Sequence, residues 1–186
     1  MKNFLSYVFE IAKIIIISLA IILPVRYYLI QPFYVKGASM EPNFHDHEYL
    51  IINEIGYRFN DPVRGDIVVF KYPQNPQEYF IKRIVALPNE KVQIKDGHVL
   101  IFNQDYPQGM ILEEKYLEEG IRTYSVSEEI VSVGESEYFL LGDNRVSSKD
   151  SRSFGPVDRS FIIGKVFFRG WPFNRMGVFK APEYQY

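Results

Sequence analysis

The chain has 186 residues, with 21 Lys and Arg against 23 Asp and Glu for a formal net charge of −2, and it contains no cysteine. Disulfide bonds, cysteine nucleophiles and cysteine-ligated metals are therefore excluded, and no block of basic residues supports a nucleic-acid partner. Aromatic residues make up 16% of the chain, and together with many Val and Ile residues they favour β structure.

The N-terminus contains an apolar run long enough to cross a membrane. Phe4 to Leu23 is a stretch of 20 residues, which as a helix would be about 30 Å long, the thickness of the hydrocarbon core of a bilayer. Glu10 and Lys13 lie three residues apart, on one face of such a helix, where they can pair. We expect a retained single-pass anchor in the lipid bilayer.

Three alternatives to this anchor each lack a feature that they require. A cleaved signal peptide needs a site of small residues, and none follows the run before Gly37. A buried soluble helix, or an amphipathic helix in the membrane plane, needs a polar face, and Ile14 to Leu23 has no polar residue except Ser18. Orientation is not decided by charge, because basic residues flank the run almost equally.

The remainder of the chain has the pattern of short strands separated by turns. Runs rich in Val, Ile, Phe and Tyr predict strands at residues 48–53, 65–72, 78–87, 91–94, 98–102, 137–143 and 161–169. The pair Asp96-Gly97 predicts a tight hairpin, and the acidic stretch 108–119 is either a loop or a short helix. The sequence therefore predicts a membrane anchor in residues 1–30 and one β-rich domain in residues 31–186.

One serine is a candidate nucleophile. Ser39 lies in the segment GASMEP, between Gly37 and Pro42, which does not resemble the Gly-x-Ser-x-Gly turn of common hydrolases. A serine hydroxyl needs a positioned base to react. His45 and His47 are one option for this base, although a His-x-His pair in a polar turn is more often solvated than catalytic.

A neutral lysine is the second option for the base, and we favour Lys82. In the run EYFIKRIVAL, alternation places Lys82 on the same strand face as Phe80, Ile84 and Ala86. Burial among apolar side chains disfavours the ammonium form and lowers the pKa of a lysine. Without other information, however, a lysine in a strand more often packs its apolar stem against the protein and extends its amine to solvent than acts as a buried base.

A dense polar segment follows an apolar run at residues 140–157, with the sequence LLGDNRVSSKDSRSFGPV. Asp150 and Arg152 can form a charge-assisted pair that would stiffen this segment. Composition fits an ordinary solvated turn as well as a hydrogen-bonded scaffold beside a site.

Taken together and in this order, these stretches resemble the bacterial type I signal peptidase family, membrane-bound proteases with a Ser–Lys dyad. GASMEP resembles the family's Ser-Met-x-Pro box, GDIVVF its Gly-Asp-hydrophobic strand, YFIKRIVALPNE its Lys-Arg box, and GDNRVSSKDSRSFGPV its polar box ending in Asp-Ser-Arg. The resemblance covers most of residues 1–172 and is thin between residues 98 and 133. It implies a mainly β fold, with a signal-peptidase-like β-barrel catalytic domain after the N-terminal transmembrane helix.

The resemblance also implies a role for each matched residue. Ser39 would be the nucleophile, Lys82 the general base held neutral by burial, and Ser148 the hydroxyl that orients the lysine amine. The residues that would support this pair are Asp150, Arg152, Arg83, Asp143, Asn144 and Gly142. The residues that would line a shallow apolar substrate pocket are Val35, Met40 and Ile81. Gly37 stands where some family members have a serine that donates to the oxyanion.

The activity implied by the resemblance is removal of signal peptides from exported preproteins, by cleavage after small residues. It implies a protein of the plasma membrane with the catalytic domain on the extracytoplasmic side, and we expect no cofactor, metal or nucleic acid. Two alternatives remain open. One is a self-cleaving repressor-like peptidase, which would carry a DNA-binding domain where this chain has an apolar run, and the other is an inactive membrane-tethered relative that acts as a scaffold.

Overall fold

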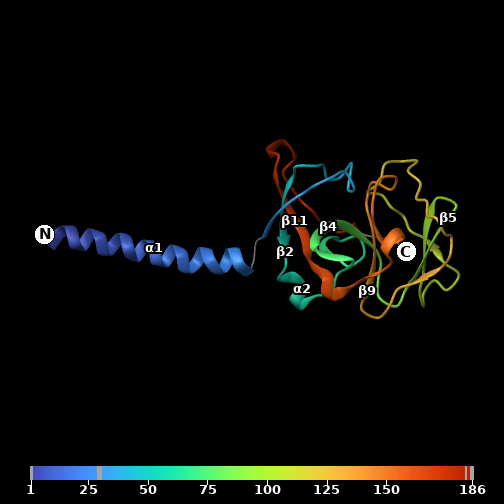
Figure 1. The fold of residues 1–186 in the computed structure, drawn as a ribbon, viewed down its shortest axis with the longest axis horizontal. Helices are drawn as coiled ribbons and strands as arrows, with labels where there is room; N and C mark the ends of the chain where they lie inside the picture. The colour runs from blue at the N-terminus through green and yellow to red at the C-terminus, as the bar shows by residue number, and fades with distance from the viewer. Residues whose placement is uncertain (1, 29–30, 183, 185–186) are drawn as a thin grey trace.

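The computed structural model describes residues 2–28, 31–182 and 184, and Figure 1 shows a long N-terminal helix leading away from a β-rich domain. This helix, α1 (Lys2–Tyr28), contains from Ser6 to Leu23 a segment long and apolar enough to cross a membrane, and none of that segment is buried inside the structure. It is a candidate span by length and composition. Residues 29–30, where the predicted boundary between anchor and domain falls, lie outside the described residues.

Two antiparallel sheets make up the domain. The larger sheet follows the order β1 (Gln31–Tyr34), β2 (Tyr49–Asn53), β11 (Ile162–Trp171), β3 (Ile67–Tyr72), β4 (Asn75–Ala86), β9 (Glu137–Leu141) and β10 (Val157–Asp158), and β12 (Gly177–Val178) pairs with β11. The smaller sheet follows the order β7 (Met110–Ile111), β6 (His98–Phe102), β5 (Lys91–Lys95) and β8 (Val131–Ser132). The short helices are α2 (Gly56–Phe59), α3 (Ser151–Phe154), η1 (Arg159–Phe161) and η2 (Phe173–Arg175).

The larger sheet is open, so the domain is mainly β as predicted but the predicted closed barrel is not found. Within the described residues, the path through this sheet ends at β1 and β10, which pair with β2 and β9 and not with each other. Closing a barrel requires the two edges of the sheet to pair along their length. Here the edge strands have only four and two residues, which leaves little length for such pairing.

The predicted strands are confirmed, because the seven segments overlap β2, β3, β4, β5, β6, β9 and β11. The hairpin at Asp96-Gly97 is confirmed as well: the two residues have φ values of 52° and 79°, and Lys95 pairs with His98 across the turn. A two-residue turn with positive φ at both positions has a backbone twist that matches the right-handed twist of the flanking strands. The stretch 108–119 forms no helix; β7 occupies part of it and the remainder is irregular.

Most of β3 and β9 and the second half of β4 are buried on both faces, which explains why their sequences are largely apolar. Ile81 of β4 packs in a core cluster with Met40, whereas Ile84 of the same strand packs in a second cluster with Phe70. Because Met40 directly follows Ser39 in the chain, the first cluster supports the turn that carries the candidate nucleophile.

An irregularity in β4 separates Ala86 from the residues that precede it. The pairing register of β4 with β9 shifts between Ile84 and Ala86. Phe80 and Ile84 pack in the same cluster, as alternation predicts, but Ala86 packs in the cluster beneath the smaller sheet. Ala86 therefore packs apart from Phe80 and Ile84, because an irregular pairing locally bends and twists the strand.

Candidate active site

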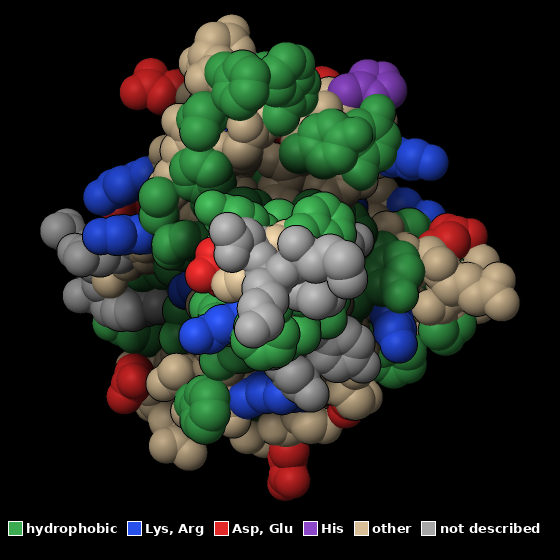
Figure 2. Space-filling view, turned by 90° about the vertical axis from the view of Figure 1, so that its left-hand side faces the viewer, with side chains coloured by type: hydrophobic (Ala, Val, Ile, Leu, Met, Phe, Trp, Pro, Cys, Tyr) green, Lys and Arg blue, Asp and Glu red, His purple; other side chains and the backbone are tan. Residues whose placement is uncertain are grey.

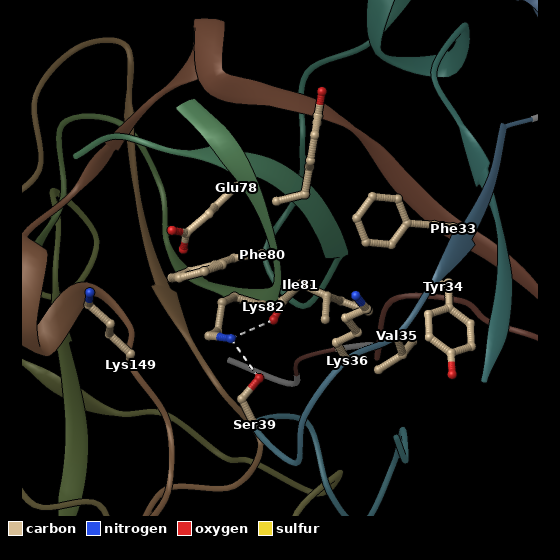
Figure 3. Close-up of a pocket in the computed structure, with 11 residues that line it drawn as sticks. Phe33, Tyr34, Val35, Lys36, Ser39, Glu78, Phe80, Ile81, Lys82 and Lys149 are labelled. Atoms are coloured by element: carbon tan, nitrogen blue, oxygen red, sulfur yellow. Dashed lines mark hydrogen bonds between the residues drawn. The ribbon is translucent and has the colours of Figure 1, made fainter. Parts of the chain in front are cut away.

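Ser39 and Lys82 lie side by side, although they are 43 residues apart in the chain (Figure 3). Lys82 Nζ is 2.7 Å from Ser39 Oγ, and it donates a second hydrogen bond of 2.8 Å to the carbonyl oxygen of Ile81. The bond to Ile81 shows that the lysine side chain folds back along β4. This side-chain conformation directs the amine toward Ser39 rather than straight out from the strand face.

Burial lowers the pKa of Lys82 to about 8, from an ordinary value of 10.5. The residue is only 3% exposed, and taking an ammonium group out of water disfavours the charged form. The negative charges of Asp150 and Asp143 act in the opposite direction and limit the shift. With this pKa, about one amine in ten is neutral at pH 7 and able to accept a proton.

The backbone around Ser39 is held from two sides. On the core side, the N–H of Phe44 donates to the carbonyl of Met40 at 2.9 Å, and both side chains are buried. On the opposite side, Asn144 donates from its backbone N–H to the Ser39 carbonyl at 3.1 Å and from Nδ2 to the Ala38 carbonyl at 3.0 Å. Asn144 therefore fixes the carbonyl groups of the candidate nucleophile and of its predecessor.

Arg83, the neighbour of Lys82, joins four segments around the site. Its Nε and Nη2 donate to the two carboxylate oxygens of Asp143 at 2.8 and 2.7 Å, in a pair that is almost entirely buried. Its Nη1 donates to the carbonyl of Gly65 at 3.0 Å, and Asn43 Nδ2 donates to Asp143 at 2.8 Å. The bidentate geometry fixes the guanidinium and the carboxylate relative to each other.

A second buried ion pair stiffens the segment of residues 142–152. Arg152 donates from Nε and Nη2 to Asp150, both at 2.8 Å, and the Gly142 N–H donates to the same carboxylate at 3.0 Å. Burial raises the pKa of Asp150, but the hydrogen bonds and charge of Arg152 outweigh it, so the pKa lies below its ordinary value. The segment is thus a hydrogen-bonded scaffold and not an ordinary solvated turn.

Ser148 packs against Gly142 and makes no hydrogen bond to Lys82 in the described part of the chain. Its Oγ is buried and has no hydrogen-bond partner of ordinary geometry, although the hydroxyl is close enough to Asp150 to help lower the pKa of that carboxyl. A Cβ atom on Gly142 would lie 2.1 Å from Ser148 Oγ and 2.5 Å from the Ser39 carbonyl oxygen. Gly142 is therefore the point where the two serines approach each other.

A cleft of about 530 Å³ opens beside Ser39 and Lys82, and Figure 3 shows the side chains that line it. Two of the three expected pocket residues, Val35 and Ile81, line this cleft. Met40 does not, because its side chain is 1% exposed and packs in the core beneath the turn. The turn needs an apolar anchor below it, and Met40 supplies it.

The structure does not bring a histidine to Ser39. His45 lies 3.4 Å from Glu41, and His47, whose side chain is 73% exposed, packs against Tyr34. Neither histidine lines the cleft, so the option of a histidine base has no support. In the described part of the chain, no group of three or more His, Cys, Asp or Glu side chains could hold a metal ion.

The backbone near Ser39 offers one candidate donor for an oxyanion. Gly37 has a φ of 90°, and its N–H donates to Asp46 at 2.9 Å, so this group is engaged away from the cleft. Within the described residues no hydrogen bond is made by the N–H of Ser39. That N–H is the group able to donate to an oxygen atom bound beside the Ser39 hydroxyl.

Three residues that were not predicted as site residues complete the site. Asn43 bridges the turn to Asp143, the ring of Tyr116 lies 3.8 Å from the guanidinium of Arg83, and Arg145 is buried in an ion pair with Glu114 at 2.8 Å. Glu114 and Tyr116 belong to an irregular segment that carries no recognisable motif. Only the folded structure places them against the polar segment.

This arrangement, a serine hydroxyl beside a partly neutral lysine amine on a mainly β domain, is that of a candidate serine hydrolase with a lysine base. Residues 8–171 match the family described as signal peptidase, peptidase S26, and the chain belongs to this family of serine peptidases. It is 38% identical over 185 residues to a signal peptidase I of Leptolyngbya laminosa, with 95% of this chain and 86% of the relative covered.

Two other curated relatives are also described as signal peptidases. A probable signal peptidase I-2 of Synechocystis sp. is 34% identical, with 91% of this chain and 76% of the relative covered. A signal peptidase IB of Staphylococcus aureus is 31% identical, with 98% and 97% covered. A crystal structure of a signal peptidase I from Enterococcus faecalis V583 has 31% sequence identity and a TM-score of 0.46, covering 57% of this chain and 97% of its own.

Proposed function

We propose that this chain is a membrane-anchored endopeptidase that removes signal peptides from exported preproteins, cleaving after small residues with Ser39 as nucleophile and Lys82 as general base. The observation that carries the proposal is the 2.7 Å separation of Lys82 Nζ and Ser39 Oγ, together with a lysine pKa of about 8. Membership of a signal peptidase family supports the substrate class.

In the proposed reaction, the neutral amine of Lys82 accepts the Ser39 proton while Oγ attacks the carbonyl carbon of the peptide bond. The carbonyl oxygen becomes an oxyanion, and the Ser39 N–H donates to it. The Lys82 ammonium then gives its proton to the leaving nitrogen, the C–N bond breaks, and an ester to Ser39 remains. Water, deprotonated by the same amine, hydrolyses the ester and restores the serine. The Ile81 carbonyl holds the amine in place during these steps.

The supporting residues act by position. Asn144 fixes the carbonyl groups of Ala38 and Ser39, while the carboxylates of Asp143 and Asp150 are each tied to an arginine. Ser148 lies close to these residues. We assign to it the role of orienting the Lys82 amine, which requires its buried hydroxyl to rotate toward that amine. The branched side chains of the cleft leave room for a small residue before the cleaved bond and disfavour larger ones.

We assign residues 1–30 to the membrane anchor and residues 31–186 to the catalytic domain, on the extracytoplasmic side of the plasma membrane. Figure 2 looks toward the domain along α1, so hydrophobic side chains of this helix lie in the foreground, and other hydrophobic side chains lie around it. Tyr49 and Trp171 are cross-strand partners with half-exposed rings, and the ring of Phe173 is mostly exposed beside Trp171. Exposed aromatic residues of this kind are typical of a surface that meets a bilayer interface.

Covalent labelling tests the proposal. The full-length protein in detergent is treated with a reactive peptide that ends in alanine, and mass spectrometry of its proteolytic fragments locates the adduct. We expect an acyl group on Ser39 in the wild type and none in Ser39→Ala. A folded wild type that neither reacts nor cleaves a preprotein would support the inactive scaffold instead. Self-cleavage without preprotein cleavage would support the repressor-like alternative.

A further inference from the structure

The cleft has an apolar half and a charged half, on opposite sides of Ser39. Phe33, Val35 and Lys36 line the first half, which is mainly apolar, whereas Phe80, Glu78 and Lys149 line the second half, which we call the charged half, as Figure 3 shows. Because the two halves differ in chemistry, they suit different parts of a substrate chain. The apolar half has the character expected for residues of a signal peptide.

The position of the base indicates which half contacts the residues after the cleaved bond. The leaving nitrogen must take its proton from Lys82 Nζ, so the new N-terminus forms beside this amine. Lys82 Nζ lies 5.4 Å from the centre of the Phe80 ring, which lines the charged half of the cleft. The apolar half adjoins β1, the first strand after α1. The mature chain therefore leaves past Phe80, away from the anchor.

A row of aromatic rings leads from the amine to Lys149. Phe80 stacks on Tyr72, with the ring centres 4.7 Å apart and an interplanar angle of 13°. The ammonium of Lys149 lies 4.4 Å from the centre of the Tyr72 ring. An extended peptide advances about 3.4 Å per residue, so a chain that passes Phe80 reaches Lys149 within roughly its first four residues.

Lys149 is a cation on a firmly held backbone. It lies between Ser148, which packs against Gly142, and Asp150, which is completely buried. Its side chain is exposed, and within the described residues its ammonium forms a cation–π contact and no salt bridge. Glu78 shares this end of the cleft but already accepts a hydrogen bond of 2.8 Å from Asn75. At this end of the cleft, Lys149 is thus the cation able to receive a new partner of opposite charge, whereas the exposed Lys36 lies at the other end, beside Val35.

We propose that Lys149 is a specificity-determining residue that pairs with an acidic side chain among the first four residues of the mature protein. This inference rests on the proposed cleavage at Ser39. Because Lys149 is exposed, the preference is modest: an exposed ion pair gives about a two- to fivefold advantage over a neutral residue. A basic residue at the same position is disfavoured to a similar degree. The preference weakens as salt concentration rises, because ions screen exposed charges.

The test uses full-length protein and a series of preproteins that differ only in the first four mature residues. Each position carries Asp, Ala or Lys in turn, and kcat/KM is measured at low and high salt. At one position we expect the wild type to cleave Asp faster than Lys by about tenfold at low salt. Lys149→Gln should bring this ratio close to one, and Lys149→Glu should invert it. Glu78→Gln should increase it, because it removes the opposing charge at the same end of the cleft.

Lys91→Glu is the matched control, because it makes the same change of charge at an exposed position of β5, outside the residues that line the cleft. It should leave the Asp-to-Lys ratio unchanged. A wild type that cleaves Asp and Lys substrates equally at all four positions overturns the inference while leaving the proposed function intact, as does a preference that survives Lys149→Glu. A wild type that cleaves no member of the series overturns the proposed function, and the inference falls with it.

Discussion

Gly142 and Ser39 approach so closely that a single added carbon atom cannot be placed between them. A Cβ on Gly142 would stand 2.5 Å from the Ser39 carbonyl oxygen, which is a backbone atom held by Asn144. Rotation of the Ser148 side chain could relieve the clash with its hydroxyl, but neither the contact of 2.5 Å with the Ser148 Cβ nor the clash with the Ser39 carbonyl could be relieved in this way. The missing side chain at residue 142 thus sets the position of the candidate nucleophile.

Gly142→Ala should therefore displace Ser39 and reduce kcat by about a hundredfold or more, since shifts near 1 Å at a reacting group have effects of that size. The loss of folding stability should be smaller, about 1–3 kcal/mol, as for other overpacked sites. Gly177→Ala is the control, because a Cβ there meets nothing within 4 Å. Turnover assays and thermal unfolding of both variants check the prediction. Wild-type turnover by Gly142→Ala would show that the contact is not needed.

The pH dependence of activity should follow Lys82. Because the neutral amine is the active form and its pKa is about 8, kcat/KM should rise about tenfold per pH unit below pH 8 and level off above it. Lys82→Arg keeps the charge but cannot lose its proton near neutrality, so it should be inactive. The double variant His45→Ala, His47→Ala should keep the wild-type profile. A profile that this double variant abolishes would point to a histidine base.

Specificity for a small residue should depend on Ile81. Trimming Ile81 to alanine enlarges the cleft, so cleavage after Val or Leu should increase relative to cleavage after Ala by about 5- to 100-fold, the effect of removing a steric clash of 1–3 kcal/mol. Ile84→Ala is the control, because it removes a similar volume on the other face of β4. A preprotein series with Ala, Ser, Val, Leu and Phe before the cleaved bond measures both variants. Equal cleavage after Ala and Phe by the wild type would rule out a small pocket.

Membrane attachment should depend on the first 30 residues. The full-length chain should remain in the membrane pellet after carbonate extraction, because a spanning helix resists conditions that remove peripheral proteins. A chain that starts at residue 31 should move to the soluble fraction or bind membranes only weakly through its exposed aromatic side chains. Recovery of the full-length chain in the soluble fraction would contradict a retained span.

The elements predicted from sequence were those with a strong local signal. Continuous apolar runs identified the long strands. The pair Asp96-Gly97 identified the hairpin, because Asp and Gly tolerate the positive φ values that its turn requires. Short strands such as β1 and β8 have no pattern of their own, because their partners in the sheet determine them. The open edges of the larger sheet likewise depend on pairing between distant segments.

The residues of the candidate site that lie in sequence motifs could be predicted, whereas those positioned by tertiary packing could not. The family resemblance predicted that Ser39 and Lys82 act as a pair, and in the structure Lys82 Nζ lies 2.7 Å from Ser39 Oγ. Met40, expected in the pocket, instead faces the core, since a motif gives no information about the direction of a side chain. Asn43 and Tyr116 could not be predicted, because their contacts join segments that are distant in sequence.

Asn144 binds Ala38 across 106 residues of the chain and also binds its neighbour Ser39, and these bonds have a consequence for the order in which the protein becomes active. During synthesis the apolar residues 4–23 leave the ribosome long before residues 142–152 exist. Contacts of such high sequence separation form late in folding. In the proposed membrane protease, the anchor segment would therefore be available for insertion while Ser39 is still unaligned and inactive. Chains truncated before residue 142 are expected to reach the membrane but to remain unlabelled by the reactive peptide.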